Sequence, residues 1–90
     1  MDTFKKKFTI KGNNGWLEPP AHQRCGAAIK VLAALTVEMR RNSHGAFKLR
    51  ILKSGLHKTK CELECPDLED YETLKLLFLC EQGAYFDWRD

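Results

Sequence analysis

The chain has 90 residues, of which 43% are hydrophobic and 30% charged, with three prolines, six glycines and a formal net charge of +3. This size and composition exclude a disordered chain and predict a single domain over residues 1–90, because two smaller units would each have too small a core. No apolar run approaches the roughly 18 residues that span a bilayer, and the basic start lacks the apolar stretch of a signal peptide. We therefore expect a cytoplasmic protein with no membrane segment and no cofactor.

The first half of the chain predicts a strand and then a long helix. Residues 4–11 alternate between apolar and polar side chains, which is typical of a half-buried strand. A loop with glycine, asparagine and proline follows. Residues 21–41 carry apolar side chains at helical spacing and end with two arginines, which favour the C-terminal end of a helix.

The second half predicts a hairpin and a second helix. Residues 46–52 and 57–65 alternate again and are joined by a short turn, which indicates an antiparallel pair with Ile51 pointing inward. Asp67 is a candidate N-cap for a helix over residues 68–82, and Gly83 is a natural stop.

The order strand, helix, strand, strand, helix, with one apolar face per element, predicts a two-layer α+β fold. Both helices then cover one face of a small, mainly antiparallel sheet. The C-terminal tail carries Tyr85, Phe86 and Trp88. We expect these aromatic residues either to dock on the core or to form a homodimer or partner interface.

The cysteines predict structural thiols rather than a metal site. Cys61 and Cys65 lie on one face of a predicted strand, roughly 13 Å apart, which is too far for a disulfide or a shared zinc ion. We expect both to be buried, and Cys80, inside an apolar run, to be a core residue. The histidines and cysteines form no zinc signature, so no metal site is predicted.

Charge is divided unevenly along the chain. Residues 1–60 hold 13 basic and three acidic residues, whereas residues 61–90 hold two basic and nine acidic residues. Seven basic residues of the predicted strands share the outer face of the sheet: Lys5, Lys7, Lys11, Lys48, Arg50, Lys58 and Lys60. Such a face indicates contact with RNA or DNA, and a solvated sheet surface explains the same residues. The face has no aromatic residue on which the bases of a single strand could stack.

Cys25 is the candidate nucleophile, because it falls in the first turns of the predicted long helix. A helix N-terminus and a nearby cation lower the pKa of a thiol, and His22 and Arg24 precede it closely. His22 would be the base of this site. A buried thiol beside a surface histidine explains the same residues.

Gly12, followed thirteen residues later by Cys25 at the start of an alanine-rich helix, resembles the ribosomal-processing cysteine proteases, the Prp or YsxB-like family. The resemblance covers about residues 7–82. The position of the family's catalytic histidine is Asn13, which cannot accept the thiol proton, and the family's aspartate falls at His22. The resemblance therefore implies a related fold without the protease activity.

In the resembling family the loop before the helix borders the peptide-binding cleft. The resemblance thus implies a surface for a protein partner made of Asn13, Asn14, Trp16 and Arg24. Our leading prediction is a small, non-catalytic binding or regulatory protein of the phage or accessory kind. The alternatives are a thiol peptidase with Cys25 and His22, and a nucleic-acid-binding protein that uses the basic sheet face.

Overall fold

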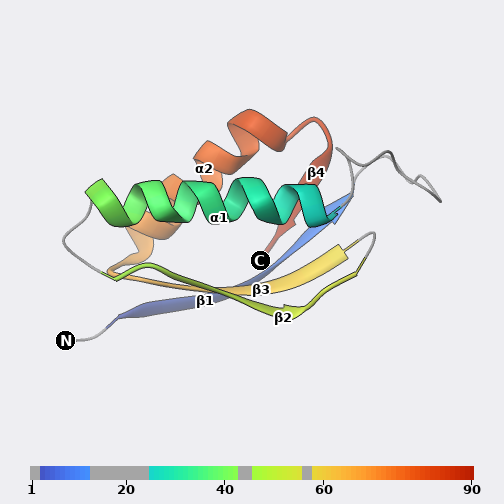
Figure 1. Cartoon of the computed structure of the whole chain (residues 1–90). Helices are drawn as coiled ribbons and strands as arrows, with labels where there is room; N and C mark the ends of the chain where they lie inside the picture. Colours follow the sequence, from blue (N-terminus) through green and yellow to red (C-terminus); the bar gives the residue numbers. More distant parts are fainter. Residues whose placement is uncertain (1–2, 13–24, 43–45, 56–57) are drawn as a thin grey trace.

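The computed structural model describes residues 3–12, 25–42, 46–55 and 58–90. Its two helices lie on one face of a four-stranded sheet (Figure 1), which confirms the predicted two-layer α+β fold. The elements in chain order are β1 (Phe4–Gly12), α1 (Cys25–Asn42), β2 (Lys48–Lys53), β3 (Lys58–Cys65), α2 (Leu68–Gln82) and β4 (Phe86–Arg89). No helix of these described residues is long and apolar enough to cross a membrane.

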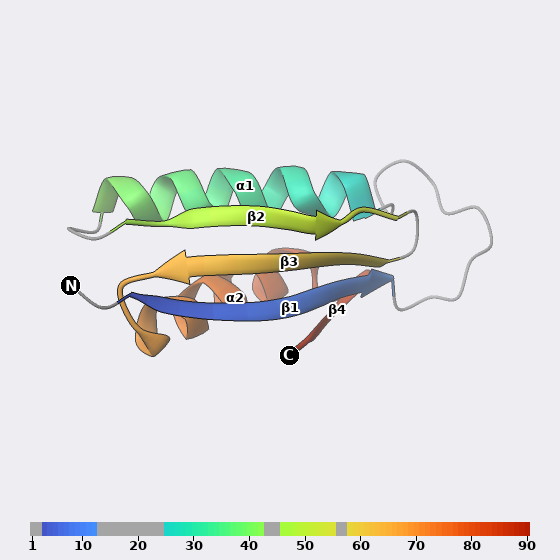
Figure 2. The ribbon, with the colours of Figure 1, turned by 90° about the horizontal axis from the view of Figure 1, so that it is seen from below.

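The sheet is antiparallel throughout, with the strand order β2-β3-β1-β4. The unit β1-α1-β2 has β3 between its two strands, and the unit β3-α2-β4 has β1 between its two strands. This is the ferredoxin-like arrangement. Figure 2 shows the open face of the sheet with both helices behind it. Because folds of this kind carry many unrelated activities, function has to be inferred from the side chains on the surfaces.

The tail supplies a fourth strand, β4, which is absent from the predicted order of elements. β4 pairs with the end of β1, from Thr9 opposite Arg89 to Gly12 opposite Phe86. Phe86 and Trp88 are buried, and the Trp88 ring stacks on Phe8 with 4.0 Å between the ring centroids. These two aromatic residues therefore dock on the core of their own chain, while Tyr85 is exposed.

The helices follow the predicted pattern at most positions. In α1 the buried side chains are Ala28, Leu32 and Thr36, and the Thr36 hydroxyl donates a hydrogen bond of 2.8 Å to the Leu32 carbonyl. In α2 the Asp67 side chain accepts a hydrogen bond from the backbone N–H of Asp70, so the predicted N-cap is confirmed.

Two residues predicted to be inside are exposed. Cys80 was expected in the core, but α2 buries Tyr71, Leu74 and Phe78, and Cys80 lies two residues past Phe78, on the other side of a helix with 3.6 residues per turn. Ile51 is 43% exposed because β2 is an edge strand, with no strand beyond it in the described residues. Cys61 and Cys65 are buried, as predicted.

Candidate nucleic-acid interface

The residues of the predicted peptidase and partner-binding sites cannot be placed by this structure. Asn13, Asn14, Trp16, His22 and Arg24 lie outside the described residues. Cys25 opens α1, but its side chain is also outside the described part. The pairing of Cys25 with His22 and the protein-binding loop thus stay predictions.

The seven basic residues predicted for the outer sheet face all lie on it with exposed side chains. β1 contributes Lys5, Lys7 and Lys11, β2 contributes Lys48 and Arg50, and β3 contributes Lys58 and Lys60. Alternation places them opposite the buried residues of the same strands, such as Phe8, Ile10 and Cys61. The structure therefore brings together on one surface cations from three strands.

At one end of this face, acidic residues on β3 alternate with the cations. Glu64 lies between Lys5 and Lys48, and its carboxylate is 3.5 Å from the Lys5 ammonium. One row along, Glu62 lies opposite Arg50, with 3.5 Å between carboxylate and guanidinium. Lys7 lies on the other side of Glu62, so each of these two rows holds two cations and one anion.

Figure 2 shows the other end of the sheet, where β1 ends and β3 begins. This end carries an excess of positive charge. Lys58 lies directly opposite Lys11, and Lys60 lies directly opposite Lys53. Like charges in direct cross-strand positions destabilise a sheet. Asp87 of β4 lies opposite Lys11 on its other side, but none of these four lysines has an ion pair within the described residues, so two repulsive pairs remain at this end.

Lys53 reaches the outer face through an irregularity in β2. The pairing passes from Ile51 opposite Cys61 to Lys53 opposite Lys60, so Leu52 is an extra residue in the edge strand. Such a bulge shifts the following side chain to the other face of the sheet. The sequence predicts a strand that ends at residue 52 and puts Lys53 in the turn, so Lys53 is not among the seven cations predicted for this face.

Arg89 is the second basic residue that was missed, and it comes from β4. Its side chain is exposed beside Thr9, and its guanidinium is 3.5 Å from the carboxylate of Asp87. The order Phe86, Asp87, Trp88, Arg89 alternates apolar and charged residues, and this short period-two pattern was the available signal.

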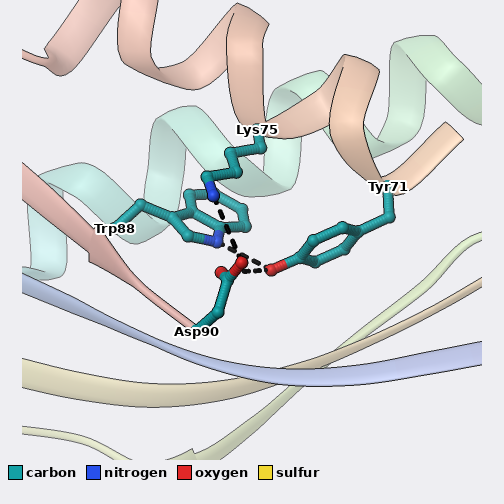
Figure 3. Close-up of polar contacts among 4 residues, drawn as sticks. All are labelled: Tyr71, Lys75, Trp88 and Asp90. Carbon is teal, nitrogen blue, oxygen red and sulfur yellow. Dashed lines mark hydrogen bonds and ion pairs between the residues drawn. The ribbon is translucent and has the colours of Figure 1, made fainter. Parts of the chain in front are cut away.

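A polar cluster fixes the end of β4 (Figure 3). The Tyr71 hydroxyl donates a hydrogen bond of 2.6 Å to Asp90 and accepts one of 2.8 Å from the Trp88 indole N–H. The Lys75 ammonium, also on α2, donates to the other Asp90 oxygen at 3.2 Å. These contacts attach β4 to α2 and so hold Arg89 beside the middle of β1.

The cluster also changes the acidity of its members. Burial raises the pKa of the Tyr71 hydroxyl, and its hydrogen bond to Asp90 adds to that rise, so Tyr71 stays protonated. Burial by itself would raise the pKa of Asp90, but hydrogen bonds from Tyr71 and Lys75 and the charge of Lys75 lower it below its ordinary value. Asp90 is therefore a carboxylate at neutral pH, and the cluster contains one anion and one cation.

Two open hollows lie along the positive end of the sheet. The first, of about 430 Å³, surrounds the small Thr9 side chain, and its charged lining residues are Lys7, Lys53, Lys60, Arg89 and Asp90. The second, of about 350 Å³, lies at the hairpin between β2 and β3 and is lined by Lys53, Ser54, Gly55, Lys58 and Lys60. Lys53 and Lys60 line both hollows, and among the charged lining residues cations outnumber anions.

Two further kinds of site to consider among the described residues of the chain are a metal cluster and a reactive Cys65. No three His, Cys, Asp or Glu side chains within them come together as metal ligands. Burial raises the pKa of the Cys65 thiol to about 11, and its sulfur lies 3.2 Å from the Asp67 carbonyl. Cys65 is thus a protonated structural thiol at neutral pH.

Comparison with known proteins adds no family: no protein-family model matches the chain, and no curated protein matches it by sequence.

Proposed function

We propose that this protein binds nucleic acid through the phosphate backbone, using the outer face of the sheet. The two Lys–Lys pairs at the positive end, Lys11 with Lys58 and Lys53 with Lys60, carry the proposal. Lysines often protect exposed strand edges from aggregation, but β1 and β3 are central strands with partners on both sides. Protection of an edge therefore does not account for Lys11 and Lys58.

The chemical character of this face favours nucleic acid over an acidic protein. The outward positions of β1 and β3 are occupied by Lys, Glu and Thr, with no apolar side chain among them. Protein–protein interfaces have a largely apolar centre, whereas interfaces with nucleic acid are polar and positively charged.

The side chains of this face also predict whether binding depends on the base sequence of the nucleic acid. Recognition of single-stranded bases depends on stacking against aromatic side chains, and no aromatic residue occupies the outward positions of these strands. Contacts to phosphate position a nucleic acid without reading its bases. Binding through this face is thus independent of sequence and sensitive to salt.

The experiment measures binding of a fluorescently labelled single-stranded RNA of 20 nucleotides by anisotropy between 50 and 200 mM salt. If about five lysines contact phosphates, the logarithm of the binding constant falls with the logarithm of salt concentration with a slope of about −3.5. A change of base sequence leaves the affinity unchanged within about threefold.

The double variant Lys58→Glu with Lys60→Glu tests the surface directly. It should weaken RNA binding at least tenfold while raising the free energy of unfolding by about 0.5 kcal/mol, because two repulsive cross-strand pairs become attractive. Lys30→Glu makes one such lysine-to-glutamate change on an exposed position of α1, in the other layer, and serves as the control for a change in net charge, against which each single variant, Lys58→Glu or Lys60→Glu, is also compared.

Three results would contradict the proposal. The first is no binding at 50 mM salt, and the second is an equal loss of affinity in Lys30→Glu. The third is competition by polyglutamate as strong as that by unlabelled RNA, because the face would then select negative charge alone.

The leading prediction from the sequence is a different binding function, and it remains a proposal of its own. The segment with Trp16 would contact a protein partner, on a fold related to the processing proteases but without their activity. Trp16→Ala in a pull-down with a purified partner tests it, and the RNA-binding double variant should leave that interaction intact.

A further inference from the structure

The outer edge of β2, on the side away from β3, is a second surface of interest. Among the described strands β2 pairs with β3 alone, so one row of its backbone N–H and C=O groups has no strand partner. Such an edge is a template on which an extended peptide can add a further strand. The bulge at Leu52 limits regular pairing to Lys48–Ile51, which is room for a short segment.

An apolar groove runs beside this edge on the helix side. It has a volume of about 270 Å³ and is lined by Ile29, Ala33, Val37 and Arg40 of α1 with Leu49 and Ile51 of β2. Ile51 is 43% exposed and Val37 is 44% exposed, although both are large apolar side chains. A strand added beside β2 would place every second side chain next to Leu49 and Ile51, against this groove.

Arg40 closes one end of the groove. Its guanidinium donates two hydrogen bonds to the Phe47 carbonyl, with its Nε atom at 3.1 Å and its Nη2 atom at 2.6 Å. The Phe47 carbonyl, just before β2, therefore already accepts hydrogen bonds within the chain. Backbone pairing with an added strand would start after Phe47, at Lys48.

The other face of the edge strand is basic. Lys48, Arg50 and Lys53 point to the outer face of the sheet, beyond the apolar groove. The side chains of an added strand that alternate with its apolar ones would lie next to these cations. Acidic residues at those positions give favourable cross-strand pairs.

The same charges argue against a second copy of this chain as the occupant. If two β2 strands paired antiparallel, the residues facing each other on the outer side would come from the same set of Lys48, Arg50 and Lys53. Directly opposed like charges destabilise such a pair, and the bulge shortens it further.

We propose that the edge of β2 and the adjoining groove bind an extended peptide segment in which acidic and apolar residues alternate. The segment adds a fifth strand, its apolar side chains lie against Val37 and Ile51, and its carboxylates face Lys48 and Arg50. Lys48 and Arg50 also belong to the basic face, but Lys11 and Lys58 do not contribute here, and the proposal does not depend on nucleic-acid binding.

The test uses a six-residue peptide of alternating valine and glutamate, capped at both ends, with binding to the full chain measured by calorimetry. A block peptide of three valines followed by three glutamates has the same composition and charge. The alternating peptide should bind at least tenfold more tightly. Methylation of every second backbone nitrogen on its pairing edge should abolish that advantage, because it removes the hydrogen bonds of an added strand.

Two protein variants locate the site. Ile51→Lys should weaken binding of the alternating peptide at least tenfold, and its circular dichroism spectrum should match that of the unchanged protein because Ile51 is already half exposed. Leu76→Lys makes the same substitution type at a position of α2 that is 62% exposed and should have no effect. Arg50→Glu should shift the preference toward a peptide of alternating valine and lysine.

Equal binding of the alternating and block peptides would overturn the proposal, and so would an N-methylated peptide that binds as well as its parent. An unchanged affinity in Ile51→Lys would also overturn it. A homodimer seen by sedimentation and lost in Ile51→Lys would show that a second copy is the occupant.

Discussion

The hydroxyl of Tyr71 is a single atom whose removal tests the polar cluster behind β4. Tyr71→Phe keeps the ring, and with it the edge contacts to Phe8 and Trp88 at centroid distances of 6.1 and 5.9 Å. The variant loses the acceptor for the Trp88 indole N–H, a buried hydrogen bond of 2.8 Å, and the donor to the Asp90 carboxylate at 2.6 Å.

The expected loss of stability follows from these two bonds. A hydrogen bond between neutral groups contributes about 1 kcal/mol, and one to a charged group about 1.5–3 kcal/mol. Because Asp90 is partly exposed and water can replace the lost donor, the lower part of that range applies to it. We expect the free energy of unfolding to fall by about 2–3 kcal/mol, or roughly 10–20 °C in Tm for a chain of this length.

The difference should depend on pH, because the Tyr71 hydroxyl helps to lower the pKa of Asp90 in the folded protein. A depressed carboxylate pKa stabilises the fold above the ordinary value of 3.8, and that contribution is lost as pH falls through the folded pKa. The difference in free energy of unfolding between the parent protein and Tyr71→Phe should therefore become smaller below about pH 4. What remains there is the contribution of the hydrogen bond from the Trp88 indole.

Urea unfolding followed by tryptophan fluorescence at pH 7 and at pH 2.5 measures both quantities. Asp87→Asn is the matched control, since it removes a carboxylate of the same strand whose ion pair with Arg89 is exposed, and it should change stability by less than about 0.5 kcal/mol. A destabilisation by Tyr71→Phe below 0.5 kcal/mol, or a gap of the same size at both pH values, would refute the reasoning.

Three further predictions concern other parts of the fold. In the native protein, iodoacetamide at pH 8 should modify the exposed Cys80 at least tenfold faster than Cys65, because burial raises the pKa of the Cys65 thiol to about 11. Peptide mass spectrometry measures the two rates, and equal rates would contradict the burial of Cys65. Gly55→Ala should lower the free energy of unfolding by about 1 kcal/mol or more in urea unfolding, because a Cβ there would lie 2.7 Å from the Lys58 carbonyl oxygen; an unchanged value would show that the hairpin adjusts freely. Asp67→Ala should cost about 1 kcal/mol by the same measurement through loss of the N-cap, and Asp67→Asn should restore most of it.

Regular alternation and helical spacing were sufficient to predict most of this fold from the sequence. In residues 58–65 every inward side chain is buried, so a period of two was an unambiguous signal. The helix over residues 68–82 was predicted with its N-cap because Asp67 follows Pro66 and precedes acidic residues that suit the helix N-terminus.

The departures have local physical causes. β4 has four residues and owes its stability to pairing with β1 and to the Trp88 contacts, neither of which is visible in a short tail. The position of Lys53 depends on a bulge, and a bulge reverses the inside–outside assignment of every following residue. Cys80 lies in a continuous apolar run, where composition does not tell which side of the helix meets the core.

The pairing of β1 also has a consequence for how the chain folds. Both neighbours of this first strand, β3 and β4, come from the second half of the sequence, and Thr9 is the partner of Arg89 near the other end. Contacts so distant along the chain form late, and during synthesis β1 leaves the ribosome well before its partners. Until then Phe8 and Ile10 lie in an unpaired segment with Lys7 on one side and Lys11 on the other, and flanking charges of this kind oppose aggregation.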